Sequence, residues 1–561
     1  MNSNSLSPSP ASAALPGWRL PRFALSRWQW LAAGLSLVTL IPLAVILASF
    51  LHIDGEIWAH LSEFVLPRLL ANTALLLVGV SLGVLLLGVP LGWLVAVHEF
   101  PGRWLFSWAL MLPLAMPAYV MAFTQIGLFD FTGVVQTWLR DTWGSSAWMP
   151  PIRSRGGVLL VMSLALYPYV FLLARDAFAT QGRRALEAAQ SLGLNPWQGF
   201  WRVALPMARP WLMGGVSLAL MEALADFGAV SIFSFDAFTT AIYKAWFGMF
   251  SLSAASQLAS LLVLLVFVLI WLEQHIRGRR AYHAGRLAAP QPRLPLRGAS
   301  AWLACGFASL VLLLAFVLPF GQLLVWAARV WQADLDARYI DFVWHSLALA
   351  GMAGALVVCV ALALSYAQRR DPQPRTRLLV RLATLGYAVP GTVLAVGLFI
   401  PVAWLDNLLL AWLGEALPSG TTAIFKGTLA VMLLAYLARF AAVGFSSVDA
   451  AMQRITRSQE ETARTLGESG WRLLRRVHVP MLRGGLFTAL LMVLVDVMKE
   501  MPITLMTRPF GWDTLAVRIF EMTSEGEWER AALPAVTLVL TGLLPVLLLA
   551  HSSSSAQAPS R

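Results

Sequence analysis

The stretch ALEAAQSLGLNPWQGFWRVALPMARP (residues 185–210) is polar and contains arginines, yet it lies between two long apolar runs. A second version, EETARTLGESGWRLLRRVHVPMLRGG (residues 460–485), follows later in the chain. The offset is constant, because Glu187 and Glu461, like Pro206 and Pro480, are 274 positions apart. A polar segment that occurs twice with the same internal spacing indicates a duplicated chain, and it divides the sequence into two halves.

The apolar composition predicts a membrane protein. Of the 561 residues, 58% are hydrophobic and only 12% are charged, and the mean hydropathy is +0.70, whereas a soluble domain has about a quarter of its residues charged. Runs of roughly 20 apolar residues, enough to cross a hydrocarbon core about 30 Å thick, recur along the chain. They lie near residues 28–50, 72–97, 104–127, 157–178, 211–234, 253–275, 301–326, 345–367, 378–404, 427–447, 484–507 and 531–550.

The order of these runs predicts the fold class and its symmetry. Six runs precede the midpoint and six follow it, so the duplicate enters the membrane in the same direction as the original. We therefore predict an all-α polytopic membrane protein with about twelve transmembrane helices in two parallel six-helix repeats. The predicted divisions are an N-terminal tail (1–27), a first repeat (28–276), a basic linker (277–300), a second repeat (301–550) and a C-terminal tail (551–561).

Charge in the loops predicts the orientation. The formal net charge is +12, and the arginines gather in alternate loops, while the other loops are mixed or acidic. This is the topology signal of an inner membrane protein, and it explains the basic balance better than a nucleic-acid partner does. We expect a multi-pass protein of a bacterial inner membrane, with the lipid bilayer as its surroundings. Both termini and both copies of the polar loop are predicted to be cytoplasmic.

Each copy of the polar loop predicts two short helices joined by a tight turn. In the first copy a helix is expected to end at Gly193, Asn195 caps the next helix, and Pro206 ends it. In the second copy Gly467 and Ser469 take the first two of these roles. We call these units the first knob (residues 185–210) and the second knob (residues 460–485). The alternative, interfacial helices lying on lipid, would not require identical spacing in both copies.

The two knobs resemble the cytoplasmic signature of binding-protein-dependent ABC importer permeases, in which Glu-Ala-Ala is followed by Gly and later by Leu-Pro. The second copy departs from that pattern at Thr462 and Val479. In that family each loop sits in a groove of an ATPase subunit, so the resemblance implies two ATPase copies. The residues that it implies for ATPase docking are Glu187, Ala188, Ala189, Gly193, Trp197, Arg202 and Pro206, and Glu461, Ala463, Gly467, Trp471, Arg476 and Pro480.

The resemblance covers about residues 70 to 550 and is closest to fused permeases of the ferric-iron uptake type. It rests on residues 239–264 and 496–535, with EALADFGAV (residues 222–230) as the partner of the second stretch. It implies a subunit that carries ferric iron delivered by a periplasmic binding protein. Thiamine, a polyamine or an oxyanion such as sulfate stay open as cargo, because cargo choice in this class lies largely in the binding protein. An ion-coupled secondary transporter is the alternative mechanism, although it has no reason to keep the repeated loop.

The chain carries no sequence signature of an enzyme. It contains no G-x-x-x-x-G-K-[ST] phosphate loop, and its eight histidines form no metal-ligand spacing. We therefore expect no catalytic residue, no metal site and no cofactor on this chain. ATP and Mg²⁺ are expected on the partner ATPase.

Ionisable residues occupy equivalent positions in two apolar spans. Glu222 and Asp226 recur as Asp496 and Glu500, and Lys499 lies beside the second pair. A charge inside the bilayer costs at least about 2.5–3.5 kcal/mol on insertion scales, so each of these groups needs a partner or water. We predict that all five line a pathway between the halves, with Lys499 paired to an acid; a buried structural ion pair is the alternative. Helix breaks within the spans are expected at Pro113, Pro117, Pro168 and Pro390.

Overall fold

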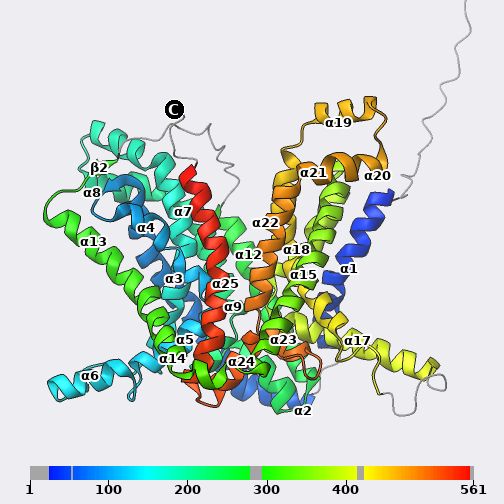
Figure 1. Ribbon diagram of the computed structural model, residues 1–561, viewed down its shortest axis with the longest axis horizontal. Helices are drawn as coiled ribbons and strands as arrows, with labels where there is room; N and C mark the ends of the chain where they lie inside the picture. The colour runs from blue at the N-terminus through cyan, green and yellow to red at the C-terminus, as the bar shows by residue number, and fades with distance from the viewer. Residues whose placement is uncertain (1–24, 52–54, 278–292, 414–421, 556–561) are drawn as a thin grey trace, which may run out of the picture.

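The computed structural model describes residues 25–51, 55–277, 293–413 and 422–555, and every structural statement below concerns these residues. Residues 1–24 of the predicted N-terminal tail, residues 278–292 of the linker and residues 556–561 of the predicted C-terminal tail lie outside them. Helices make up nearly all of the described chain (Figure 1). The sheet in this part is a two-residue parallel pair, β1 (His98–Glu99) with β2 (Leu294–Pro295).

The first half contains α1 (Arg27–Ala48), α2 (Gly55–His60), α3 (Leu66–Val97), α4 (Arg103–Ala109), α5 (Ala118–Phe129), α6 (Val134–Trp143), α7 (Arg155–Ser191), α8 (Pro196–Gly199), α9 (Leu205–Ala225), α10 (Gly228–Ile232), α11 (Phe238–Tyr243) and α12 (Leu252–Arg277). The second half contains α13 (Ala299–Leu312), α14 (Leu318–Asp334), α15 (Ala337–Arg370), α16 (Pro374–Ala383), α17 (Gly391–Leu413), α18 (Leu429–Gln453), α19 (Arg457–Thr465), α20 (Gly470–Leu473), α21 (Val479–Met481), α22 (Arg483–Lys499), α23 (Pro502–Thr507), α24 (Leu515–Ser524) and α25 (Trp528–Ser555). Short 3-10 or π segments join some of them: η1 (Ser49–Leu51), η2 (Leu61–Val65), η3 (Leu112–Ala115), η4 (Phe200–Ala204), η5 (Lys244–Gly248), η6 (Leu313–Val317), η7 (Leu385–Ala388) and η9 (Leu474–His478).

The all-α polytopic fold is confirmed. In the described ranges ten helices are long and apolar enough to cross a membrane, and a bent pair, Gly470–Met481 with Arg483–Lys499, adds an eleventh if it is one span. The position of the twelfth predicted span is occupied by α25, a helix of 28 residues. Every predicted apolar run therefore falls on a helix or on a pair of consecutive helices.

The duplication is visible in the order of the elements. The series α9, α10, α11 and α12 in the first half recurs as α22, α23, α24 and α25 in the second. Pro117 and Pro390 break their spans alike, because each follows a 3-10 segment and directly precedes an α-helix. Pro113 is the second residue of the first of these 3-10 segments. The break predicted at Pro168 is wrong: this proline lies inside continuous α7, where the packed neighbours α3 and α9 support the helix.

The two halves are tied together by their first helices. The helix α1 packs mainly against α16 and α17 of the second half, while α13 lies against α3 and α4 of the first. Both knobs project from the same end of the molecule, which is the upper end in Figure 1, and α2, α6 and α24 lie at the other end. This arrangement puts both duplicated polar segments at one end of the molecule, as the charge pattern of the loops predicts.

Candidate functional site: two knobs and a charged cavity

The first knob starts with a sharp turn at the end of α7. Gly193 has a φ of +79°, and its N–H donates to the carbonyl of Gln190 at 2.9 Å. The N–H of Leu194 reaches back to the carbonyl of Ala189 at 3.0 Å. These two bonds form a Schellman motif, in which a glycine adopts the left-handed conformation that strains other residues. The predicted turn at Gly193 is confirmed.

The second knob is built by the same bonds. Gly467 has a φ of +86°, and its N–H donates to the carbonyl of Arg464 at 3.0 Å. The N–H of Glu468 donates to the carbonyl of Ala463, also at 3.0 Å. The two turns form the same two hydrogen bonds. The identical spacing of the two copies therefore corresponds to the same backbone conformation.

Asn195 and Ser469 occupy the N-cap positions that the sequence predicts for the second helix of each knob. The side chain of Asn195 accepts from the N–H of Gln198 at 2.8 Å and starts α8. Ser469 stands at the equivalent N-cap of α20, but its side chain makes no capping bond there. The first knob therefore has the better-capped second helix.

The predicted helix end at Pro206 is wrong. The chain stays helical from α8 through η4 into α9, and Pro206 lies in the first turn of α9. A proline is tolerated in a first turn because its missing N–H leaves no helical bond unmade there. In the second knob the helical run continues past Pro480 to Met481, where the chain bends by 73° into α22. The two knobs thus differ in how they join the membrane-spanning helices below them.

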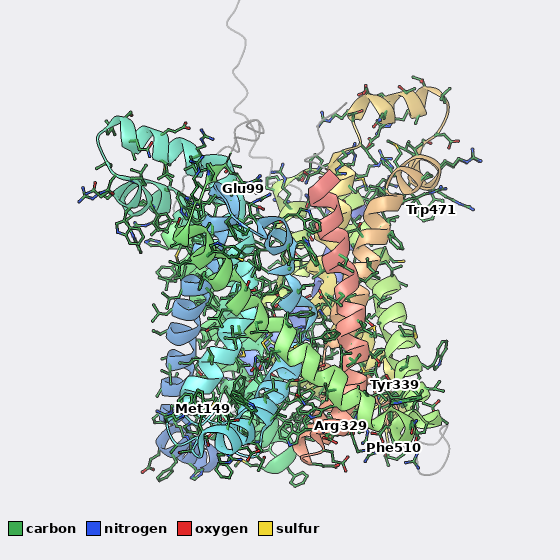
Figure 2. The ribbon with its side chains drawn as sticks, turned by 60° about the vertical axis from the view of Figure 1, so that its left-hand side comes forward. Glu99, Met149, Arg329, Tyr339, Trp471 and Phe510 are labelled. Carbon is green, nitrogen blue, oxygen red and sulfur yellow. The ribbon has the colours of Figure 1, made fainter. Side chains whose placement is uncertain are left out.

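The knobs expose equivalent side chains to the same extent. Leu192 and Leu466 are 79% and 78% exposed, and Trp197 and Trp471 are 70% and 73% exposed. Ala189 is buried in the first knob, and its equivalent Ala463 is buried in the second. Figure 2 shows Trp471 at the end of the molecule opposite Phe510. Two large exposed apolar side chains at each tip form a surface suited to contact with another protein.

The exposed leucines were not among the residues that the sequence singled out for docking. Leu192 and Leu466 recur at the same offset as the glycines that follow them. This recurrence is the sequence feature that could have marked them as contact residues. A single leucine is easily overlooked, however, in a chain that is rich in apolar residues. The structure adds these two side chains to the candidate contact surface.

The charged docking candidates lie on or near the surface of the knobs. Glu187 forms an ion pair with Arg183 at 2.7 Å, and Arg476 forms one with Glu468 at 2.6 Å. A groove of about 430 Å³ on the second knob is lined by Trp471, Arg472, Arg475 and Arg476. Ala188, Arg202 and Glu461 are exposed on their knobs as well.

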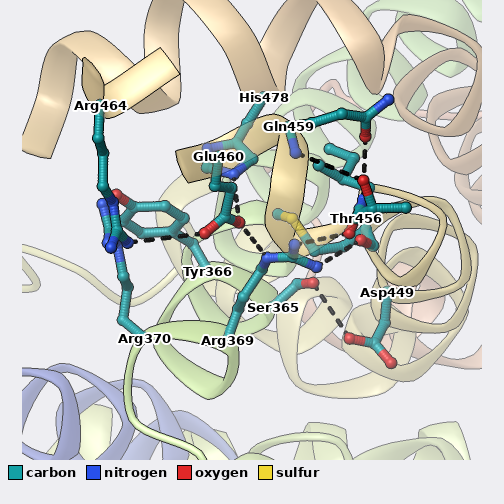
Figure 3. A network of polar contacts seen from close by, with 12 residues as sticks. Ser365, Tyr366, Arg369, Arg370, Asp449, Thr456, Gln459, Glu460, Arg464 and His478 are labelled. Atoms are coloured by element: carbon teal, nitrogen blue, oxygen red, sulfur yellow. Dashed lines mark hydrogen bonds and ion pairs between the residues drawn. The ribbon is translucent and has the colours of Figure 1, made fainter. Parts of the chain in front are cut away.

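A buried polar network anchors the second knob (Figure 3). The Glu460 carboxylate accepts from the guanidinium of Arg369 and, at 2.9 Å, from Nε2 of His478. Arg369 also donates to the carbonyls of Met452 and Ile455, at 2.8 and 2.6 Å. Burial raises the pKa of the Glu460 carboxyl, but the bonds from His478 and Arg369 outweigh it, so the net pKa lies below the usual value.

Among the described residues, no equivalent network lies below the first knob. The position equivalent to Glu460 is Leu186, which is buried, and the position equivalent to His478 is Ala204. An aromatic cluster of Trp93, Phe178 and Phe200 lies there instead. The two tips are therefore alike, while the supports under them are polar in one half and apolar in the other.

We predict that Glu460→Gln lowers the free energy of local unfolding of the second knob by about 2–4 kcal/mol, because it leaves the partly buried Arg369 guanidinium without its counter-charge. The lowered pKa stabilises the fold above the unfolded value near 4.5, and this stabilisation is lost as the pH falls through the folded pKa. The hydrogen-exchange protection factors of residues 457–482, corrected for the intrinsic pH dependence of exchange, should fall below pH 4.5 in the wild type but show no such step in Glu460→Gln. The matched control is Glu461→Gln, its exposed neighbour; equal exchange in both variants would contradict the assignment.

The five predicted pathway residues line a single cavity. It has a volume of about 200 Å³ and lies between the halves, where α9 meets α10 and α22 meets α23. The prediction that these residues line a common pathway named the acids and Lys499 but not Arg439. The structure adds Arg439, from α18, to the cavity wall. An arginine in the middle of an apolar span was a sufficient signal. The charged lining residues are Glu222, Asp226, Asp496, Lys499, Glu500 and Arg439.

Lys499 interacts electrostatically with Asp496, but among the described residues no acid lies within ion-pair distance of its ammonium. The Lys499 ammonium donates to the carbonyl of Leu114, in the other half, at 3.0 Å. The cation that pairs with an acid is Arg439, whose Nε lies 3.2 Å from the Glu500 carboxylate. The helix break after Ala115 leaves carbonyls without helical partners, so the amine finds an acceptor there.

The acids of the first half are held by neutral donors. The hydroxyl of Tyr387 donates to Glu222 at 3.2 Å, and the N–H of Val230 donates to Asp226 at 3.1 Å. In the described residues no three His, Cys, Asp or Glu side chains are placed to hold one metal ion together. The cavity is thus a charged chamber between two halves and not a preformed metal cage.

A duplicated bundle of membrane-spanning helices, with twin knobs at one end and a charged cavity between its halves, defines a multi-pass transport permease. The chain belongs to the family of binding-protein-dependent transport system inner membrane components, whose family model matches residues 88–281 and again residues 360–558. It is a fused permease of the ABC importer type, with one family unit in each half, and an inner membrane protein.

Individual relatives differ in how much of the chain they match. The chain is 27% identical over 490 residues to the Fe(3+)-transport system permease protein FbpB 2 of Haemophilus influenzae, covering 86% of this chain and 90% of the relative. It is 30% identical to the sulfate transport system permease protein CysT of Escherichia coli, covering 38% of this chain and 74% of the relative. It is 36% identical to a putative 2-aminoethylphosphonate transport system permease protein, PhnV, of Salmonella typhimurium, covering 22% and 46%.

Proposed function

We propose that this chain is the membrane-spanning subunit of an ATP-driven importer for ferric iron. A periplasmic binding protein delivers the cargo to the end that carries α2, α6 and α24. Two copies of a separate ATPase, which bind ATP and Mg²⁺, dock at the opposite end, one on each knob. This chain itself supplies the path and the docking surfaces.

The observation that carries the coupling proposal is the equivalence of the knobs. Leu192 and Leu466 differ by one percentage point in exposure, and the turns beneath them share both hydrogen bonds. Two identical partners would meet two equal surfaces, which a dimeric motor requires. An ion-coupled secondary transporter would not need this match, so the second mechanism is the weaker one.

The cargo proposal is supported by the extent of the likeness. The Fe(3+)-transport relative aligns across both halves, whereas the sulfate and phosphonate relatives align with 38% and 22% of this chain. Only a relative that spans both halves has the pathway between the halves within the compared region. This favours ferric iron over sulfate, a phosphonate, thiamine or a polyamine.

The test is uptake by proteoliposomes that contain the chain with the ATPase and the binding protein that co-purify with it. We expect ATP-dependent accumulation of radiolabelled Fe³⁺, and none of radiolabelled sulfate. Vesicles without the ATPase, held under a proton gradient, serve as the control. Uptake by those vesicles would refute ATP coupling, and accumulation of sulfate in place of Fe³⁺ would refute the cargo.

A further inference from the structure

We propose that the central cavity is a transit site for a small multivalent cation that prefers oxygen ligands, received by Glu222, Asp226 and the phenol of Tyr119. This inference rests on the proposed function and deepens it, because it assigns the cargo a place on this chain. The observations that carry it are the charges of the cavity wall, the partners of its two cations, and one buried hydroxyl without a partner.

The cavity carries an excess of acids. Four carboxylates line it against one guanidinium and one ammonium, which leaves two formal negative charges if all six groups are ionised. Glu222 and Asp226 come from the end of α9, while Asp496 and Glu500 come from the equivalent end of α22. A low-dielectric wall of one sign concentrates ions of the opposite sign.

Both cations of the cavity already have partners. Arg439 faces Glu500 at 3.2 Å and donates to the carbonyl of Val389 at 2.9 Å. Lys499 is bonded to the carbonyl of Leu114. An oxyanion entering the cavity would meet a guanidinium already paired with Glu500 and an ammonium that already interacts electrostatically with Asp496. The other two acids, Glu222 and Asp226, lie on the first-half wall, where their hydrogen-bond donors are the neutral hydroxyl of Tyr387 and the N–H of Val230.

Tyr119 supplies the independent observation. Its side chain is 5% exposed and lines the cavity, and its hydroxyl has no hydrogen-bond partner. The hydroxyl lies close enough to Asp226 and Glu500 to interact with both electrostatically. A buried hydroxyl without a partner costs about 1–3 kcal/mol, so a group that is there only for packing would be a phenylalanine. Phenol and carboxylate oxygens together form the ligand set of a hard cation.

Among the described residues no group of three His, Cys, Asp or Glu side chains is placed to bind one metal ion. This fits a site that a cation passes through better than a site that holds it permanently. A transported ion must bind well enough to enter and weakly enough to leave. With a volume of about 200 Å³ the cavity holds a small cation and part of its water shell. Carboxylates on both halves can then approach the ion as the halves move and withdraw afterwards.

The first experiment compares the wild type with Glu222→Gln/Asp226→Asn in the proteoliposome assay. Loss of the two first-half charges should lower Fe³⁺ uptake at least about tenfold, while ATP hydrolysis by the docked ATPase persists. Glu99→Gln/Asp176→Asn, which removes two exposed acids outside the cavity, the knobs and the delivery end, is the matched control and should keep wild-type uptake. Equal uptake by both double variants would overturn the inference.

The second experiment measures binding on the purified chain alone with Tb³⁺, whose luminescence is sensitised by nearby tyrosines. We expect Tyr119→Phe, which keeps the ring and its packing, to weaken saturable Tb³⁺ binding about tenfold or more, and sulfate not to compete. If both Tyr119→Phe and Glu222→Gln/Asp226→Asn bind Tb³⁺ with wild-type affinity, the inference is overturned. Two variants are used so that poor folding of one does not decide the test. Failure of the iron proposal is separately visible, because the wild type would then bind Tb³⁺ in the cavity yet accumulate no Fe³⁺.

Discussion

Replacing Gly193 and Gly467 together by aspartate is expected to abolish ATP-driven uptake, with a loss of at least about 100-fold, while the protein still inserts. Both glycines have positive φ, and a Cβ at either would point into open space. Aspartate reaches the left-handed conformation at a cost of about 1–2 kcal/mol, so the turns persist. The new carboxylates would project beside Leu192 and Leu466, where they would remain unpaired in a dry contact.

The matched control for this double variant is Gly144→Asp. Gly144 also has positive φ and open space around its Cβ position, but it follows α6 at the opposite end of the molecule. The ATPase should co-purify with the control but not with the double variant. Undiminished uptake by Gly193→Asp/Gly467→Asp would show that the knobs do not transmit force.

Replacing Arg439 by methionine is expected to destabilise the chain by about 3–5 kcal/mol, because it leaves the buried Glu500 carboxylate without its counter-charge. Arg439 is 8% exposed and also donates to the carbonyl of Val389, so one substitution removes an ion pair and a hydrogen bond. The measurement is the loss of monodisperse protein in detergent on heating. The single variant should melt well below the wild type.

Two further variants separate the ion pair from a general loss of charge. Arg439→Met/Glu500→Gln removes both charges and should recover most of the lost stability, since no unpaired ion remains. Arg530→Met breaks an exposed pair with Asp334 and should cost less than about 1 kcal/mol. If Arg439→Met melts like Arg530→Met, the cavity pair does not stabilise the fold.

The parts of the fold that the sequence predicts correctly are those set by local spacing. Apolar runs of bilayer length gave helices, and Gly193 and Gly467 gave turns with the same two bonds, because a glycine that ends a helix has few other conformations. Pro117 and Pro390 broke their helices, but Pro168 did not. Whether a proline breaks a span depends on the helices packed beside it, and a single sequence does not show them.

The parts that were missed depend on contacts between distant segments. The partner of Glu500 is Arg439, 61 positions earlier, and Lys499 bonds a carbonyl 385 positions away in the other half. Glu460 reads as an ordinary acid beside Glu461, yet folding buries the first and exposes the second. Choosing among such pairings requires the packing of α15, α18 and α22, which periodicity alone does not specify.

The central claim is that two ATPase subunits act on this permease through the knobs. Its most direct measurement is cross-linking in membranes, with Cys305 and Cys359 replaced by alanine and a single cysteine introduced by Leu192→Cys or Leu466→Cys. The account predicts that a short bifunctional reagent joins each variant to the ATPase, at a rate that changes with bound ATP. Phe510→Cys, fully exposed at the opposite end, should give no such product. Cross-linking of the ATPase to Phe510→Cys, or to neither knob, would contradict the account.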